Sequence, residues 1–229
     1  MVDCIASLAC DEFHMDDWGV DVMVAACQKG IMVPPGVSFV FFNQKAKDRQ
    51  KSLKMVASYW DWGPRINPDY YYKYFGGTAP THHLYGLDVA LDMILKESIE
   101  VVWKRHEVLA TAIWAAIDEW VKGGELKANI QDKNLRSNAV TSLRVNTPNG
   151  TLLRKWLQEN TGLTIGIGLG MATPKDPNGD GFFRLGHMGH VNAQMIMALI
   201  ATLETAMIAV GVPHGNNAIN KAASVIAEL

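Results

Sequence analysis

The chain has 229 residues, of which 48% are hydrophobic and 19% are charged, and its formal net charge is −2. This composition is typical of a globular protein with one large or two small cores, and it gives no electrostatic reason to expect a nucleic acid or an anionic membrane as a partner. Three cysteines in a chain of this length do not form a disulfide framework, so we expect a cytoplasmic location.

Strand-like and helix-like segments alternate in the first half of the chain. Apolar runs at residues 2–8, 20–26 and 37–42 predict buried strands, and the mixed charges of residues 43–58 predict a surface helix. Residues 59–80 are aromatic, rich in proline and glycine and without a period, which predicts a long connecting segment. Because a terminal core strand frays without a lead-in, the abrupt start is a first indication that the chain is a fragment or has an atypical start.

A long helix is predicted over residues 84–121 and is expected to end at Gly123 and Gly124. Toward the end of this helix, apolar positions at three- and four-residue spacing form a single buried face. This face comprises Ile99, Val102, His106, Ala110, Ile113, Ile117 and Trp120.

The remaining sequence predicts an αβ module. Strands are expected at 139–145, 163–169 and 182–185, and helices at 152–159, 193–209 and 218–227. The apolar stretch 195–212 is interrupted by Glu204, so a buried helix is a better interpretation than a membrane span. We therefore predict an α/β fold with two domains, residues 1–122 and 123–229.

Lys29 is the main candidate for chemistry. It follows an apolar strand and precedes Gly30 and a Pro-Pro-Gly turn, so it lies at the end of a buried element. A lysine in partly apolar surroundings loses some of its preference for the ammonium form and becomes a usable amine nucleophile. On spacing alone, a lysine that extends from a strand end toward solvent is the favoured interpretation.

Asp3 stands 26 residues earlier on another apolar strand. A carboxylate within a core strand is costly unless it is paired, and a protonated pyridine nitrogen is one partner that would make it useful. The alternative is an aspartate at a strand end that caps the next turn.

Three stretches carry a resemblance to a known family. They are Val-Asp-Cys-Ile-Ala-Ser-Leu-Ala (2–9), Met-Asp-Asp-Trp-Gly-Val-Asp-Val (15–22) and Cys-Gln-Lys-Gly-Ile-Met-Val-Pro-Pro-Gly (27–36). Together they resemble the class V aminotransferases, in the branch of the alanine–glyoxylate, serine–glyoxylate and pyridoxamine–pyruvate enzymes. The resemblance implies the fold type I architecture of transferases dependent on pyridoxal phosphate.

The resemblance also implies roles for individual residues. Lys29 would carry the cofactor, Asp3 would hold the pyridine nitrogen, and Gln28 would contact the phosphate. Cys27 stands where the family usually has Ser or Thr, and a thiol is a weaker donor to phosphate. Residues 1–122 would be the end of the large cofactor domain with an interdomain helix, and residues 123–229 the small domain.

Two further stretches agree with the family. Tyr-Phe-Gly-Gly-Thr-Ala-Pro-Thr (74–81) is similar to the segment in which an aromatic residue and a Thr contact the partner subunit's phosphate in a homodimer. The resemblance implies Thr78 and Phe75 as these cofactor contacts, and Phe75 stands where some members have a Tyr that can donate a hydrogen bond. Phe-Arg-Leu-Gly-His-Met-Gly (183–189) is similar to the run whose arginine clamps the substrate carboxylate, here Arg184.

The implied reaction moves an amino group from a small donor (alanine, serine or a pyridoxamine-like amine) to glyoxylate or pyruvate. The resemblance spans nearly the whole chain but only about half of the family's usual length, without the phosphate-binding turn. Two alternatives stay open: a silent fragment that only dimerises, and lyase or desulfurase chemistry on the same cofactor.

Other motifs are weaker. Residues 176–181 fit the first half of a calcium loop, but its twelfth position is His187 and not Glu, so an acidic turn is favoured. The histidine pairs 82–83 and 187/190 lack a convincing set of further ligands, and no metal is expected. The glycines at 166, 168 and 170 lack the spacing of a dinucleotide site.

Overall fold

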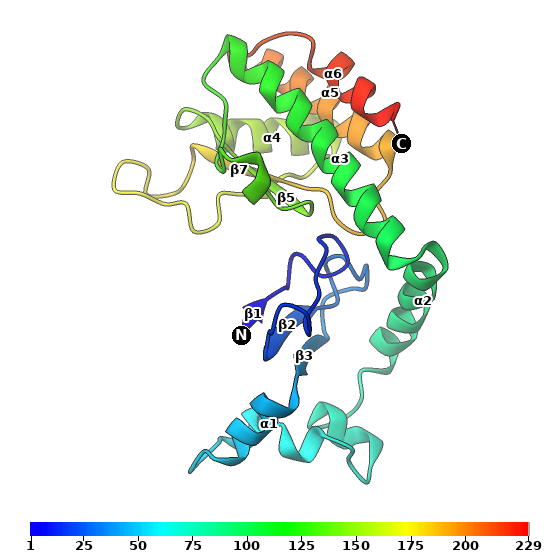
Figure 1. Cartoon of the computed structure of the whole chain (residues 1–229). Coiled ribbons are helices and arrows are strands. Elements are labelled where there is room, and N and C mark those ends of the chain that lie inside the picture. The colour runs from blue at the N-terminus through cyan, green and yellow to red at the C-terminus, as the bar shows by residue number, and fades with distance from the viewer. Residues whose placement is uncertain (229) are drawn as a thin grey trace. The chain divides into compact units, whose positions relative to one another are not determined.

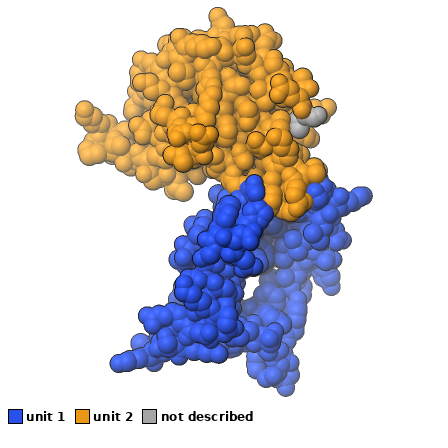
Figure 2. Space-filling view, viewed as in Figure 1, with its two compact units in different colours: residues 1–8, 12–98 blue, residues 9–11, 99–229 orange. Residues whose placement is uncertain are grey.

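The computed structural model describes residues 1–228. The chain forms two compact units (Figure 2), which are described separately. Unit 1 contains residues 1–8 and 12–98, and unit 2 contains residues 9–11 together with the chain from Ile99 onward.

Unit 1 contains a three-stranded sheet in the order β1-β2-β3. Strand β1 (Val2–Asp3) pairs in parallel with β2 (Val22–Ala26), and β3 (Ser38–Phe42) pairs with β2 in the antiparallel direction. The predicted strands at 20–26 and 37–42 are therefore confirmed to within two residues, but the predicted burial is wrong for β3, which has no buried residue. Helix α1 (Gln44–Lys51) follows, and the side chain of Asn43 caps its N-terminus by accepting the Ala46 N–H.

The predicted strand over residues 2–8 is wrong after Asp3. The Oδ1 atom of Asp3 accepts the N–H of Ile5 at 2.8 Å, which bends the backbone into a series of turns. The side chain of Asp3 is exposed in this chain and does not lie inside a core strand. The apolar residues after it resemble a strand in sequence because they contain no glycine or proline.

The connecting segment at residues 59–80 has more order than its composition suggests. It contains three short 3₁₀ turns, Ser58–Trp60, Gly63–Arg65 and Tyr71–Phe75. The guanidinium of Arg65 donates to the carbonyls of Tyr59 and Asp61 and lies over the Tyr59 ring. A single arginine therefore holds much of this segment.

The predicted helix over residues 84–121 is two helices, α2 (Thr81–Glu97) and α3 (Ile99–Trp120). They are separated at Ser98, whose φ of 73° is incompatible with a continuous right-handed helix. The predicted apolar face of α3 is confirmed for Val102, His106 and the later positions, which are buried, while Ile99 is half-buried.

Unit 2 has a four-stranded antiparallel sheet in the order β4-β5-β7-β6. Helices α3, α5 and α6 pack together, and α4 contacts β6 and β7 (Figure 1). The strands are β4 (Lys127–Ala128), β5 (Val140–Arg144), β6 (Gly166–Ile167) and β7 (Phe182–Gly186), and the helices are α4 (Asn149–Thr161), α5 (Ala193–Val210) and α6 (Ala218–Ile226). Short 3₁₀ turns occur at Val121–Gly123 and Lys133–Leu135.

The hydrophobic core of unit 2 lies between these helices and the sheet. Helix α5 is long and apolar enough to cross a membrane by length and composition, but one of its faces packs into this core. That face contributes Ile196, Ile200 and Leu203, each at most 2% exposed. The packing agrees with the core helix that the sequence predicts.

The predicted strand at 163–169 shrinks to the two residues of β6. A Cβ on Gly166 would lie 3.2 Å from the Cβ of Arg184, and a Cβ on Gly168 would lie 2.5 Å from that of Phe182. The glycines therefore permit close approach to β7. Gly170, with φ at 72°, then turns the chain away from the sheet.

The compact units divide the chain between Ser98 and Ile99, and α3 belongs to unit 2. The predicted boundary at 122/123 concerns the large and small domains of a complete enzyme, where α3 would be the interdomain helix. That boundary stays a prediction.

Candidate functional site

Lys29 lies in the loop that follows β2, at the carboxyl end of that strand. Its side chain is half-buried, and within residues 1–228 no hydrogen bond or ion pair engages its Nζ atom. Its carbonyl accepts the N–H of Met32 at 3.0 Å, which closes a tight turn around it. The lysine is therefore fixed through its backbone while its amine has no protein partner.

Cys27 holds the base of this loop. Its thiol donates to the carbonyl of Pro34 at 3.1 Å and accepts the N–H of Val37 at 3.3 Å, and its side chain is fully buried. The backbone of Cys27 bonds to Val37 and Val33 as well. Because both capacities of the thiol are used inside the loop, Cys27 supports the loop and does not face a phosphate. No local pattern in the sequence indicates this direction.

Asp3 ends β1, the parallel neighbour of β2, and its backbone lies opposite Val24. One carboxylate oxygen caps the turn at Ile5, which is the alternative role that the sequence left open. The other oxygen, Oδ2, has no hydrogen bond within residues 1–228. A single carboxylate thus shapes the turn and leaves one oxygen available.

Gln28 is exposed next to Lys29. Carboxyl ends of adjacent parallel strands are where ligands bind in α/β sheets, and Asp3, Gln28 and Lys29 all lie at those ends of β1 and β2. The structure therefore brings these three predicted residues to one edge of the sheet in unit 1.

Thr78 and Phe75 also belong to unit 1, at and beyond the end of the last 3₁₀ turn. Thr78 is exposed, whereas Phe75 is half-buried and packs edge-on against Tyr71 with ring centroids 5.6 Å apart. Gly76 adopts a left-handed conformation with φ at 65°, which turns the chain between them. Thr78 is therefore presented on the surface, and Phe75 serves the packing of its own segment.

Arg184 lies on β7 in unit 2, opposite Ser142 of β5 and Gly166 of β6. Its Nε donates to the carbonyl of Ile167 at 2.7 Å, which fixes the plane of the guanidinium. Within residues 1–228 neither terminal nitrogen has a hydrogen bond, so the outer edge of the fork is available for a bidentate carboxylate.

The acidic turn at residues 176–181 is a folding element. Both oxygens of the buried Asp176 accept backbone N–H groups, from Asp180 and Gly181, at 2.8 Å each. The Gly181 N–H, followed by that of Asp180 and the hydroxyl of Thr147, holds the pKa of Asp176 below its usual range. Residues 1–228 contain no group of three His, Cys, Asp or Glu side chains suited to a metal ion.

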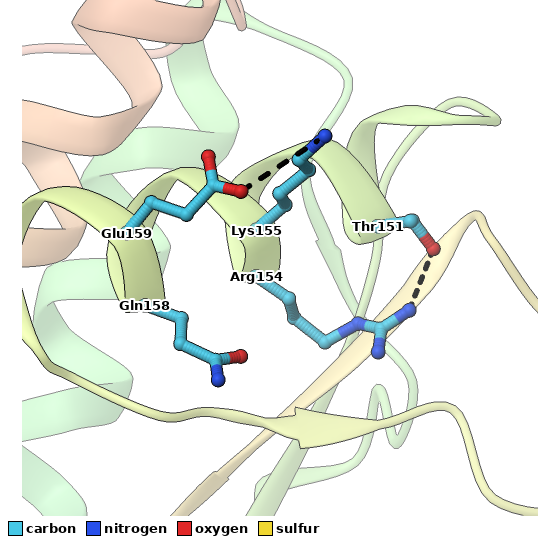
Figure 3. A pocket seen from close by; sticks show the side chains of 5 residues that line it. All are labelled: Thr151, Arg154, Lys155, Gln158 and Glu159. Carbon is cyan, nitrogen blue, oxygen red and sulfur yellow. Dashed lines mark hydrogen bonds and ion pairs between the residues drawn. The ribbon is translucent and has the colours of Figure 1, made fainter.

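Two surface hollows have linings that include none of the predicted site residues. One, of about 480 Å³, runs along α4 and is lined by Thr151, Arg154, Lys155, Gln158 and Glu159 (Figure 3). Arg154 donates to Thr151 at 2.6 Å there, and Lys155 pairs with Glu159 at 3.9 Å. The other, of about 650 Å³ in unit 1, lies between α1 and Trp60 and Trp62. Neither contains a predicted site residue.

Residues 1–194 match the family model described as aminotransferase class-V. The chain belongs to the class-V aminotransferase family. This assignment agrees with the motifs around Asp3, Lys29 and Arg184, which all lie in the matched range.

Relatives and solved structures agree with this family. The chain is 32% identical over 215 residues to an L-aspartate–glyoxylate aminotransferase of Paracoccus denitrificans, and 32% identical over 219 residues to a serine–glyoxylate aminotransferase of Arabidopsis thaliana. Each alignment covers 93% of this chain and 51% of the relative. This class-V chain therefore spans about half the length of the relatives it matches.

Among solved structures, a pyridoxamine–pyruvate aminotransferase from Mesorhizobium loti superposes with a TM-score of 0.84 at 25% identity, over all of this chain and 57% of that enzyme. An alanine–glyoxylate aminotransferase from Nostoc sp. superposes with a TM-score of 0.75 at 24% identity, over 90% of this chain and 53% of that enzyme. The predicted α/β architecture of the fold type I transferases is thereby confirmed.

The family and fold imply pyridoxal phosphate. The residues present fit one end of that group: a lysine amine and a carboxylate oxygen, both without protein partners within residues 1–228, lie at the ends of adjacent parallel strands. Fewer hydrogen-bond donors are available for the phosphate end of the cofactor, because Gln28 is exposed and the thiol of Cys27 is bound inside the loop.

Proposed function

We propose that this chain is the C-terminal half of a transaminase dependent on pyridoxal phosphate. The proposed reaction moves an amino group from alanine, serine or a pyridoxamine-like donor to glyoxylate or pyruvate. The observation that carries the proposal is the placement of Lys29 and Asp3 at the ends of paired strands β2 and β1. The relatives named for aspartate–glyoxylate and serine–glyoxylate transfer support this choice of reaction.

When bound, pyridoxal phosphate would supply the electron sink that such a reaction needs. Lys29 would hold the cofactor covalently and, once displaced by an amino donor, would move a proton through its Nζ atom. The turn closed by Met32 and the loop base formed by Cys27 would keep that amine within reach.

Asp3 would keep the ring nitrogen protonated by accepting its N–H with Oδ2. The bond from Ile5 to Oδ1 orients the carboxylate so that Oδ2 remains available. Gln28 would donate its amide to the phosphate from the position next to Lys29.

Arg184 would bind the substrate carboxylate through its two terminal nitrogens. Its bond to Ile167 restricts the side chain before any substrate arrives, which lowers the entropy lost on binding. Arginine suits this role because its planar fork matches both carboxylate oxygens.

The proposal includes a homodimer in the cytoplasm. The exposed Thr78 would contact the phosphate in the partner subunit, with Phe75 supporting its segment. The large domain would extend to residue 122 and the small domain would begin at residue 123.

A silent fragment is the second candidate, because the phosphate end of the site holds few suitable donors in this half. Desulfurase chemistry is disfavoured on physical grounds. It needs a mobile, accessible thiol, and Cys4, Cys10 and Cys27 are all buried.

The test uses the purified chain with added pyridoxal phosphate. A lysine-bound cofactor gives a visible absorbance band that borohydride reduction makes permanent, and Lys29→Ala should abolish it. Lys51→Ala should leave the band unchanged, because this exposed lysine lies on α1, which follows β3 at the end of the sheet opposite Lys29.

The same measurement separates the candidates. A band that forms only when the N-terminal half of a class-V aminotransferase is supplied would support a fragment of an active enzyme. Absence of a band with and without that half would overturn the cofactor proposal and favour the silent fragment.

A further inference from the structure

Two fully buried histidines of unit 2 have no part in the proposed chemistry. His187 follows Arg184 by three residues and lies against β5. Its Nδ1 is 2.8 Å from the carbonyl oxygen of Asn138, and its Nε2 is 2.9 Å from the hydroxyl of Thr141. The indole N–H of Trp114 donates to the same hydroxyl at 3.0 Å.

His106 on α3 binds the segment that follows His187 in the sequence. Its Nε2 accepts the N–H of Gly189 at 3.0 Å, and its Nδ1 is 2.7 Å from the carbonyl of Val102. The neighbouring Arg105 donates to the carbonyls of Gly189 and Val191 at 3.0 and 2.9 Å. Both polar groups of the Gly189 backbone are thus bound by α3.

These contacts place a proton on Nδ1 of both rings. A carbonyl oxygen only accepts, so each Nδ1 must carry a proton and donate it. The Nε2 of His106 is then an acceptor for the N–H of Gly189, and a second proton on that ring would place two donors face to face. The Nε2 of the neutral His187 ring accepts from the Thr141 hydroxyl, which could also rotate and accept a proton from it.

The same place anchors residues 9–11, which follow the turn begun at Asp3. Asp11 accepts the N–H of Asn138 and the hydroxyl of Ser137, each at 2.8 Å. Asn138 therefore bonds Asp11 through its N–H and His187 through its carbonyl. Cys10 is buried beside Gly189 and Arg105.

We infer that His187, His106 and Asp11 are positioning residues for the proposed reaction. His187 and Asp11 bind the segment after Arg184 and residues 9–11 to the same backbone at Asn138, and His106 binds the segment after Arg184 to α3 at Gly189. The inference rests on the proposed function for the roles of Arg184 and Asp3. Within it, His187 acts on Arg184 through β7: its ring locks β7 to β5 at the end of the strand that carries the arginine.

The experiment measures hydrogen exchange at Arg184 Nε–H by NMR in the full 229-residue chain, because this proton reports the bond to Ile167. His187→Phe removes both ring contacts, and Thr141→Val removes the hydroxyl that Nε2 of His187 and the indole N–H of Trp114 share. Each should speed exchange about fivefold to tenfold, as expected for the loss of about one net hydrogen bond.

Two variants make the result specific. His187→Asn keeps a donor near the Nδ1 position and should return exchange to within about twofold of the original chain. Leu203→Ala destabilises the α5 core outside the network and should leave Arg184 exchange unchanged while it lowers the melting temperature. Unchanged exchange in both His187→Phe and Thr141→Val, or equal acceleration in Leu203→Ala, would overturn the inference.

A separate arm tests the role of Arg184 itself. Titration with glycolate, an inert analogue of glyoxylate, should shift the Arg184 Nε–H resonance, and Arg184→Lys should abolish glycolate binding. The inference is supported if the His187→Phe variant binds glycolate more weakly than the original chain and the His187→Asn variant binds it about as tightly. If glycolate does not shift the Arg184 Nε–H resonance but the variants change its exchange rate as expected, the proposed substrate role of Arg184 is contradicted. The positioning network is still supported in that case.

Discussion

Unit 2 encloses a continuous core that includes Leu109, Leu157 and Ala222, whereas unit 1 leaves large apolar side chains on its surface. Strand β3 of unit 1 is apolar at four consecutive positions, 39–42, yet Val40 and Phe41 are 41% and 43% exposed. A strand without polar alternation is typical of a sheet that is covered on both faces. Unit 1 therefore has the character of one portion of a larger sheet, and unit 2 that of a complete folding unit.

The comparison has a functional side. The predicted cofactor residues lie in unit 1, and Arg184 lies in unit 2. The chain spans about half the length of its relatives. We therefore expect unit 2, which carries Arg184, to be stably folded in the isolated chain, and unit 1, which carries the cofactor residues, to be less stable.

The largest effect should come from a matched pair of leucines on helices. Leu157→Ala on α4 removes a fully buried side chain and should cost about 2–5 kcal/mol of unfolding free energy. Leu91→Ala on α2, where the side chain is 41% exposed, should cost less than about 1 kcal/mol. Urea unfolding followed by tryptophan fluorescence measures both, and equal losses would break the contrast between the units.

Hydrogen exchange should separate the units directly. We expect amides of β5 and α5 to exchange roughly 100-fold more slowly than those of residues 44–80, because α1 contains no buried residue. Mass spectrometry of peptic fragments provides the measurement. Adding the N-terminal half of a class-V aminotransferase should slow exchange in unit 1 and leave unit 2 unchanged, and uniform protection of the isolated chain would contradict this picture.

Acid should weaken unit 2 through His187. Burial lowers the pKa of His187 from 6.5 to about 4, with hydrogen bonds to backbone groups opposing some of the shift and His106 adding to it. The unfolded chain thus binds the proton more readily, so stability is fully present above pH 6.5 and is lost as pH falls toward 4.

We expect the melting temperature of the original chain to fall by several degrees between about pH 7 and pH 5. His187→Asn, which has no titrating ring, should show a flatter dependence. The other ionisable groups around His187 are Arg105, Asp11, Cys10 and His106. Both proteins keep these groups, so a difference between their curves of melting temperature against pH reports His187 alone. Parallel curves would exclude His187 as the cause.

Thiol labelling should give the smallest effect. Burial raises the pKa of Cys10 in unit 2 to about 12, an effect that the Gly189 N–H partly offsets, so the reactive thiolate is scarce. Cys4 and Cys27 are also buried, but in unit 1. Iodoacetamide should label them about tenfold faster than Cys10, because unit 1 opens more readily. Mass spectrometry locates the adducts, and faster labelling of Cys10 would reverse the comparison.

Periodicity in the sequence was sufficient for much of the fold. The buried face of α3, strands β2, β5 and β7 and helix α5 follow from spacing, because one face of each meets a core. The break at Ser98 could not be predicted, since a serine with positive φ has no marker such as glycine or proline. The shortness of β1 and β6 follows from local turns at Asp3 and Gly170, and the sequence offered the turn at Asp3 only as an alternative to a longer strand.

For the candidate site, the sequence located residues but not their directions. Lys29, Asp3 and Gln28 lie at the carboxyl ends of the adjacent strands β1 and β2, whereas the inward thiol of Cys27 depends on a contact with Pro34 and Val37. The histidine network could not be predicted because its partners come from α3, β5 and the end of β7, which no local pattern connects. The sequence offered two signals, His106 on the apolar face of the predicted helix and His187 in the glycine-bounded run after Arg184.

The placement of residues 9–11 also bears on how such chains can be rearranged. Unit 2 includes this short stretch although unit 1 surrounds it in the sequence. If the chain were divided after Ser98, Asp11 would remain with the N-terminal fragment. Ser137 and Asn138 in the C-terminal fragment would then lose the carboxylate that accepts their hydrogen bonds. A graft of only the residues after 98 would therefore lack these two hydrogen bonds, and we expect it to be more stable when residues 9–11 are supplied with it.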